Sequence, residues 1–330
     1  MAFLMTPPTR TTLPVAEMPT VRTYTADLMR RHRRQLSLVI GLHALAAVAA
    51  LVAPRVVGLL VDTVTQHGLL ETVDRLAVLL AASVVVQTGL TWVARRAAFR
   101  MGEDIFAELR EQFMDRVVSL PLSTVERAGT GDLVSRTTND VEALSHVARF
   151  GIPSIFVAVV TVVITAAAAL VTGWLVALPI FVGAPILWFS TKWYLRYAPD
   201  GYLRERATYA VMNGVITETV DGARTVDALR LGARRKARID RALADAFDAE
   251  TYTLRLRMWW FPQVEIAYLL PVAVTLLWGG FLVAAGQASV GTVTAVALYV
   301  QALAMPLDEL LMWLDEIQVG ATSLARVIGI

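Results

Sequence analysis

Hydrophobic residues are concentrated in long stretches of this chain that contain no Asp, Glu, Lys or Arg. Two of these stretches are 42 residues long, 150–191 and 266–307, and two shorter ones cover 35–54 and 76–94. A helix of about 20 apolar residues crosses the hydrocarbon core of a bilayer. Each long stretch therefore predicts two crossings joined by a turn, and the pattern predicts an all-α membrane protein.

Small and polar residues mark the predicted turns at 66–71, 172–174 and 286–291. Six transmembrane helices result, which we place at 35–64, 75–98, 150–171, 174–196, 258–284 and 291–315. The rest of the chain divides into a disordered cytosolic tail at 1–20, an amphipathic elbow helix at 21–34, and two internal arms at 99–149 and 197–257.

The basic residues orient these helices, because Lys and Arg beside short loops remain on the cytosolic side. With the N-terminus inside, 28 of the 30 basic residues lie on that side or in the tail, and only Arg55 and Arg75 lie at the outside. We therefore expect both termini in the cytosol and the protein in the inner (cytoplasmic) cell membrane. The elbow helix, with arginines at 30, 31, 33 and 34, is expected on the inner leaflet.

The two arms are long and have helical periodicity. The apolar positions are Ile105, Leu109, Phe113 and Val117 in the first arm, and Ala223, Val226 and Leu229 in the second. A helix of about 25 residues rises roughly 35 to 40 Å, so these arms extend well beyond the membrane. Their length predicts a cytosolic partner.

The composition excludes several classes of protein. Of the 330 residues, 56% are hydrophobic and 18% are charged, whereas soluble domains carry roughly a quarter charged residues. The basic residues alternate with acidic ones, so no nucleic-acid partner is expected. There is no cysteine and no His cluster with metal-ligand spacing, so no metal site is predicted. A membrane enzyme or a channel is the alternative from another class, but the sequence lacks a nucleophile–base constellation and a repeated pore motif.

Two segments of the arms resemble the exporter-type (type IV) ABC transporter membrane domain. Residues 119–144, SLPLSTVERAGTGDLVSRTTNDVEAL, resemble its first intracellular loop, whose pattern joins LP to TGDL, SR and a later D. Residues 218–230, ETVDGARTVDALR, are similar to its second loop. The chain ends in TSLARVIGI, like the exit of this family toward its nucleotide-binding domain. Further matches are Pro54, Gly58, Asp62, Pro306 and Leu307, and the resemblance covers 21–330.

This resemblance implies a domain-swapped six-helix bundle over 35–330 that works with a second membrane half, as a homodimer or a heterodimer. It also implies a short coupling helix in each arm that docks on a nucleotide-binding domain, at about 121–129 and 217–226. The implied coupling residues are Pro121, Val125, Glu126, Arg127, Thr130, Gly131, Asp132, Glu218, Asp221, Gly222 and Arg224.

The ATPase motif of such transporters is absent from the sequence. A Walker A loop, G-x-x-x-x-G-K-[ST], needs a lysine after a glycine, and neither Lys192 nor Lys236 follows one. We therefore expect no catalytic residue and no cofactor on this chain. ATP and Mg are implied for a nucleotide-binding domain, either fused beyond Ile330 or on a separate chain, in an ATP-hydrolysing translocase.

Polar and aromatic side chains at membrane depth are candidates for contact with a substrate. They are His43, Gln87, Trp92, Glu265, Tyr268, Trp278, Tyr299, Gln301, Asp308 and Glu309. Hydrogen bonding between helices is the alternative for His43, and interfacial snorkelling is the alternative for Glu265 and Asp308. Arg55 and Asp62, seven residues apart on nearly the same helical face, are candidates for an outer gate or for anchors at the headgroups.

The aromatic candidates favour a lipophilic substrate with little fixed charge. The sequence thus predicts export of a lipophilic or amphipathic small molecule, or of a lipid, by alternating access. Import of a siderophore-like compound is the alternative within the same fold, and the sequence does not separate the two directions.

Overall fold

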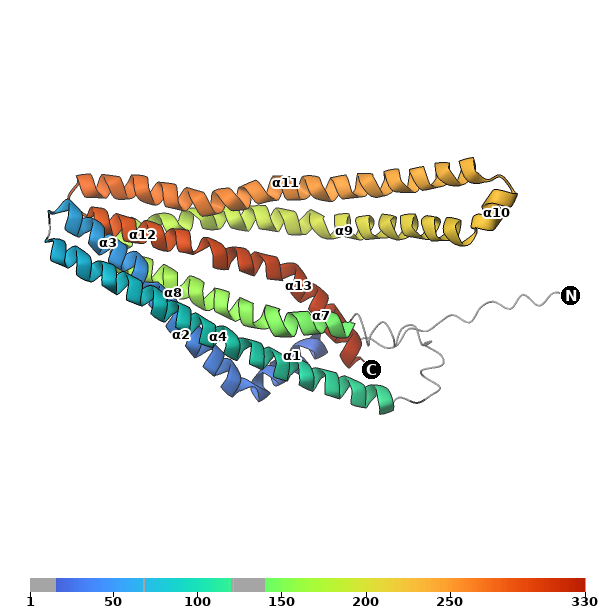
Figure 1. Ribbon diagram of the computed structural model, residues 1–330, viewed down its shortest axis with the longest axis horizontal. Helices are drawn as coiled ribbons and strands as arrows, with labels where there is room; N and C mark the ends of the chain where they lie inside the picture. The colour runs from blue at the N-terminus through green and yellow to red at the C-terminus, as the bar shows by residue number, and fades with distance from the viewer. Residues whose placement is uncertain (1–15, 68, 120, 122–139, 330) are drawn as a thin grey trace. The chain divides into compact units, whose positions relative to one another are not determined.

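The computed structural model describes residues 16–67, 69–119, 121 and 140–329. Every element in this part of the chain is a helix (Figure 1). Five stretches of it are long and apolar enough to cross a membrane. The predicted all-α membrane fold is therefore confirmed.

The helices divide the chain as follows. The first are α1 (Met18–Arg31), α2 (Arg33–Ala50), α3 (Val52–Thr65) and α4 (Leu70–Ser119). Then come α7 (Val141–His146), a π-helical turn (Val147–Gly151), α8 (Ile152–Ala177) and a 3-10 turn (Leu178–Val182). The last are α9 (Gly183–Asp221), α10 (Ala223–Ala228), α11 (Gly232–Ala284), α12 (Val290–Ala302) and α13 (Ala304–Ile328).

One of the five apolar stretches, Val141–Asp221, holds two of the six predicted spans. Gly173 interrupts its helical backbone with φ −171° and ψ 89°, inside the predicted turn at 172–174. The helix α8 resumes after this residue and continues to Ala177, and α9 then begins at Gly183. The third and fourth predicted spans therefore correspond to α8 and α9.

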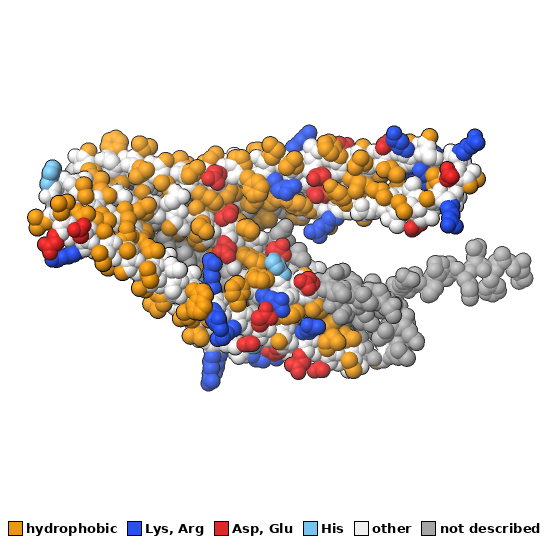
Figure 2. Space-filling model, viewed as in Figure 1, with side chains coloured by type: hydrophobic (Ala, Val, Ile, Leu, Met, Phe, Trp, Pro, Cys, Tyr) orange, Lys and Arg blue, Asp and Glu red, His pale blue; other side chains and the backbone are white. Residues whose placement is uncertain are grey.

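The chain forms two compact units. The first contains residues 1–177 and 278–330, and the second contains 178–277. The second unit is a helical hairpin in which α9 and α11 are joined through the short α10. In Figure 2, charged side chains gather toward the α10 end of this hairpin, and hydrophobic side chains become denser away from it.

Two prolines explain why the first and last predicted spans are each divided into two helices. Proline lacks an N–H, and its ring clashes with the carbonyl four residues earlier. Pro54 affects the carbonyl of Ala50, where α2 ends, and Pro306 affects that of Ala302, where α12 ends. Each span continues after one residue, Leu51 or Leu303, so the prolines bend these spans without ending them.

The two bent spans pack against each other through α3 and α12. Gly58 on α3 and Gly291 on α12 meet backbone to backbone: a Cβ at Gly291 would overlap the Gly58 carbonyl oxygen, and a Cβ at Gly58 would overlap that of Gly291. Small residues permit this close approach in membranes, where helix association depends on van der Waals packing. The crossing requires glycine on both helices.

A buried apolar cluster holds the inner end of the first unit together. The helix α4 contributes Ile105, Leu109 and Phe113, the first of which is fully buried, and they pack with residues of α1 and α13. This confirms the apolar stripe that the sequence predicts for the first arm. The arm is thus a packed continuation of the second span, because both belong to the single helix α4.

We predict that Gly291→Ala destabilises the protein by about 1–3 kcal/mol, because the added methyl group forces α3 and α12 apart. Gly89→Ala is the matched control, since nothing lies within 4 Å of a Cβ at that position on α4. The control should melt within a few degrees of the wild type. Thermal unfolding in detergent tests both variants, and equal melting temperatures for the two would contradict this account of the crossing.

Candidate substrate cavity and coupling elements

His43 lines a cavity of about 260 Å³ within the first unit. Five elements meet there: α2, α4, the π-helical turn at Val147–Gly151, α8 and α13. The other lining residues are Arg95, Ala98, Phe99, Arg149, Phe150, Pro153, Ser154, Val157 and Glu309. Of the predicted cavity residues, His43 and Glu309 line this space.

The hydrogen bond of His43 fixes which nitrogen carries its proton. Its Nδ1 lies 2.8 Å from the carbonyl oxygen of Val39, one turn earlier on α2. A carbonyl only accepts, so Nδ1 is the donor, and in the neutral ring Nε2 is an acceptor. The side chain is buried, and its hydrogen bond stays within α2 instead of joining two helices.

Arg149 and Phe150 reach the cavity from the π-helical turn at Val147–Gly151. The extra residue in such a turn re-aims the side chains around it, and π-helical turns often occur at functional sites. Arg149 pairs through Nε with Glu103 Oε1 at 2.8 Å, and its guanidinium lies 4.6 Å from the ring centre of Phe106. Phe150 packs edge to face on Phe99 of α4, with ring centres 5.7 Å apart. The turn therefore attaches firmly to α4.

Two predicted cavity residues instead support the helices. Tyr299 is only 2% exposed, and its hydroxyl donates to the carbonyl of Leu51 at 2.8 Å, at the bend caused by Pro54. The indole nitrogen of Trp278 donates to the carbonyl of Leu175 at 2.8 Å, close to the end of α8. A membrane helix that bends or ends exposes carbonyl groups, and these need hydrogen-bond donors from other side chains. The sequence pattern did not reveal that Tyr299 and Trp278 supply such donors.

The remaining predicted cavity residues do not share a site with His43. In the first unit, Gln301 and Asp308 are exposed, Gln87 is half-buried, and Trp92 lies exposed beneath Arg96 at 5.6 Å. In the second unit, Glu265 is exposed and Tyr268 is half-buried. The sequence did not single out Arg95 and Arg149, because they border the charge-free stretches 76–94 and 150–191 and resemble topogenic charges.

The predicted outer pair does not form. In the described part of the chain no ion pair joins Arg55 to Asp62, because seven residues rise about 10 Å along a helix. Asp62 instead reaches α12, where Oδ2 accepts from the Ser289 hydroxyl and Oδ1 accepts from the Gly291 amide, both at 2.7 Å. A carboxylate at this position caps the start of α12 and opposes its positive dipole. Asp62 therefore joins α3 to α12.

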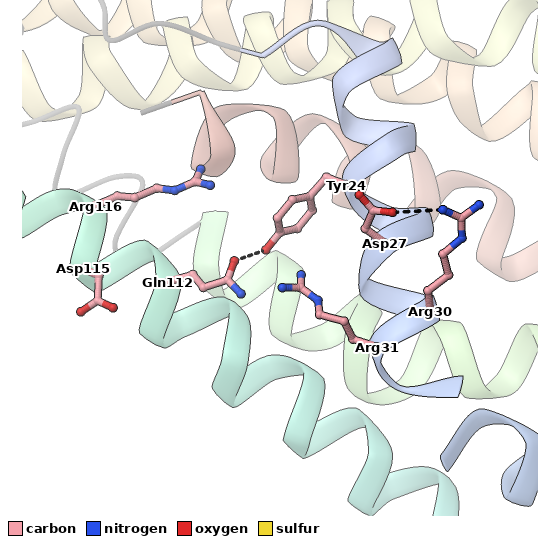
Figure 3. Close-up of a pocket in the computed structure, with 7 residues that line it drawn as sticks. All are labelled: Tyr24, Asp27, Arg30, Arg31, Gln112, Asp115 and Arg116. Atoms are coloured by element: carbon pink, nitrogen blue, oxygen red, sulfur yellow. Dashed lines mark hydrogen bonds and ion pairs between the residues drawn. The ribbon is translucent and has the colours of Figure 1, made fainter. Parts of the chain in front are cut away.

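A second hollow, of about 820 Å³, lies between α1 and α4 (Figure 3). Its polar side chains are largely engaged with one another and with neighbouring groups. Arg30 pairs with Asp27 at 3.4 Å, and Arg31 with Glu108 at 3.1 Å. The hydroxyl of Tyr24 donates to Gln112 at 2.7 Å, and burial raises the pKa of this tyrosine. We interpret these contacts as the junction that fastens the elbow helix to α4.

The first coupling element lies mostly outside the described residues. The structure does not describe the predicted coupling residues Val125, Glu126, Arg127, Thr130, Gly131 and Asp132. Pro121 is described, and its side chain is exposed. The last residue of the motif, Asp140, is buried; it pairs with Arg326 Nε at 3.2 Å and accepts from the Ser323 hydroxyl at 3.2 Å. Ser323 and Arg326 belong to the closing segment TSLARVIGI, so two segments of the resemblance meet in space.

The second predicted coupling element forms the tip of the α9–α11 hairpin. Glu218 pairs with Arg235 at 2.9 Å and with Arg238 at 3.5 Å, which ties α9 to α11 just before the turn. The helix α9 continues to Asp221, and Gly222 separates it from α10. The short helix therefore begins at Ala223, later than the predicted start at 217, because 217–221 belong to α9.

The tip presents polar and apolar side chains outward. Asp221 and Arg224 are exposed, and α10 contains no buried residue. Val220 and Leu229 are 68% and 64% exposed. A mixed surface of this kind at the end of a long hairpin is typical of a protein contact.

Comparisons with known proteins agree with this geometry. A family model described as the ABC transporter transmembrane region matches residues 36–307, most of the chain. A multidrug efflux ATP-binding/permease protein of Mycobacterium bovis is 27% identical over 300 residues, which cover 91% of this chain and 25% of that protein. The multidrug resistance-like ATP-binding protein MdlA of Escherichia coli is 24% identical over 314 residues, which cover 90% and 51%.

A third relative is named for a defined substrate. The fatty acid ABC transporter ATP-binding/permease protein of Mycobacterium bovis is 25% identical over 255 residues, which cover 77% of this chain and 40% of that protein. The chain thus spans between a quarter and about half the length of these relatives.

We predict that Asp62→Ala lowers the stability of the protein by about 1–2 kcal/mol, because the Gly291 amide and the Ser289 hydroxyl lose their acceptor. The stability of Asp62→Asn should lie between those of the wild type and Asp62→Ala, since the amide oxygen of asparagine still accepts one of the hydrogen bonds. Arg55→Gln is the control, and it should melt like the wild type. Thermal unfolding in detergent measures all three. If Asp62→Ala melted at the wild-type temperature, the cap would have no role in joining the helices.

Proposed function

Because the chain belongs to the ABC transporter transmembrane family, we propose that it translocates substrate in an ATP-driven exporter and is coupled to nucleotide-binding domains. The proposed substrate class is a lipophilic or amphipathic small molecule, or a lipid. The relatives named for multidrug efflux and fatty acids support this class. The proposed location is the inner cell membrane, with both termini in the cytosol.

The observation that carries this proposal is the long hairpin of the second unit. The helix α9 has 39 residues and α11 has 53, whereas about 20 residues cross a bilayer. The surplus turns extend beyond any membrane and end in α10, whose surroundings expose Val220 and Leu229. Such an arm suits docking on a nucleotide-binding domain, where ATP and Mg would supply the driving force.

Alternating access requires helices that can change direction at defined points along their length. The bends at Leu51 and Leu303 are of this kind, because each follows from a proline and leaves helix on both sides. We propose that these bends allow the inner and outer halves of the first and last spans to move separately. A second membrane half, identical or different, would complete the pathway.

Reconstitution in liposomes tests this function. The full-length transporter with its nucleotide-binding domains should move a fluorescently labelled fatty acid out of the compartment that corresponds to the cytosol, and only when ATP and Mg are present. Movement in the opposite direction would favour the importer. Movement of the labelled fatty acid that is independent of ATP would contradict the proposal and favour a channel.

We predict that Arg224→Glu reduces ATP-dependent transport roughly tenfold or more, because a reversed charge opposes docking at a complementary surface. The nucleotide-binding domains should retain their ATP turnover without substrate. Arg206→Glu on α9 is the control, an exposed arginine away from the tip that should transport normally. Parallel transport and ATPase assays check this, and equal transport by both variants would remove α10 from the coupling surface.

A further inference from the structure

We propose that the cavity around His43 binds the anionic head of an amphipathic substrate and that Arg95 is its principal ligand. The inference rests on the proposed function, because it names the substrate class of the same transporter. It replaces the expectation that the substrate carries little fixed charge, which rested on the aromatic side chains predicted at membrane depth. The structure instead brings together charges that are distant in the sequence.

Positive charge reaches the cavity from two sides. Arg95 extends from α4 and Arg149 from the π-helical turn. Arg149 already binds Glu103, but no ion pair joins Arg95 to an acid anywhere in the described part of the chain. The side chain of Arg95 is exposed, and its guanidinium presents a planar set of donors that fits a carboxylate or a phosphate. Arg95 is therefore the group that a bound anion satisfies best.

The walls of the cavity suit the apolar part of the same molecule. Phe99 and Phe150 form one side, and Pro153 and Val157 continue it along α8. Ligand sites usually combine such an apolar lining with a few polar groups that fix orientation. A space of about 260 Å³ holds a head group and its first few carbons, so a longer chain would extend out of the cavity.

The remaining polar residues define the selectivity. His43 offers Nε2 as an acceptor while Nδ1 binds Val39, so the neutral ring adds no positive charge. Glu309 of α13 is the acid that lines the cavity, and its charge opposes that of a bound anion. Removing the Glu309 carboxylate should therefore raise the affinity for an anion, whereas removing the Arg95 guanidinium should lower it.

Binding to the full-length transporter in nanodiscs, without nucleotide, tests this proposal. The probes are laurate, dodecanol and dodecylamine, which share a chain and differ in head charge. The wild type should bind laurate most tightly. Arg95→Gln should weaken laurate binding roughly tenfold, the usual scale for a lost charge-assisted hydrogen bond, and change dodecanol binding less than twofold. Glu309→Gln should strengthen laurate binding, an effect that misfolding cannot produce.

Arg96→Gln is the matched control, because this neighbouring arginine lies over Trp92 and does not line the cavity. It should bind laurate like the wild type. Equal affinity of the wild type for laurate and dodecanol, or equal losses in Arg95→Gln and Arg96→Gln, would overturn the proposal. Transport is measured separately. Selective binding of laurate without ATP-driven efflux would refute the exporter function and support the anion site. ATP-driven efflux with no preference for the charge of the head group would support the exporter function and refute the anion site.

Discussion

Backbone polar groups inside a bilayer have no water to bind, and this constraint organises the first unit. Its first span bends at Pro54 and its last span begins at α12, so both expose backbone groups that need partners. The structure satisfies two of these groups from the other span. Tyr299 donates to the carbonyl of Leu51, and Asp62 accepts from the amide of Gly291. These two hydrogen bonds therefore join the first and last spans, and the close backbone contact at Gly58 brings the two spans near enough to form them.

The opposite end of the same unit adds charged contacts to its buried apolar cluster. Asp140, at the end of the first coupling motif, pairs with Arg326 near the end of α13. Arg116 of α4 also donates to the carbonyl of Ile328 at 3.1 Å. These contacts link the first arm to the segment that leads toward a nucleotide-binding domain in the family. The first arm is therefore in direct contact with α13, the helix that also carries Glu309 into the cavity.

The cavity around His43 brings together charged and polar residues that are far apart in the sequence. His43, Arg95, Arg149 and Glu309 lie on four different segments and are brought to one space by packing of α2, α4, α8 and α13. Taken singly, each has an ordinary interpretation as an interfacial or helix-bridging residue. Together they form a polar cluster with apolar walls, which is the arrangement expected of a site that orients an amphipathic molecule.

The sequence by itself determined the all-helical membrane fold and the apolar stripe of α4, and Pro54 and Pro306 set the bends locally although the hydrophobic pattern predicts continuous spans. These features depend on residues close together in the chain, because insertion of a helix and loss of a hydrogen bond are local events. Only the tertiary structure decided that Tyr299 supports a bend, that Asp62 caps α12 instead of pairing with Arg55, and that Arg95 shares a cavity with His43. Contacts between helices depend on crossing geometry and on glycine at single positions, and no local pattern encodes which distant side chain lies opposite.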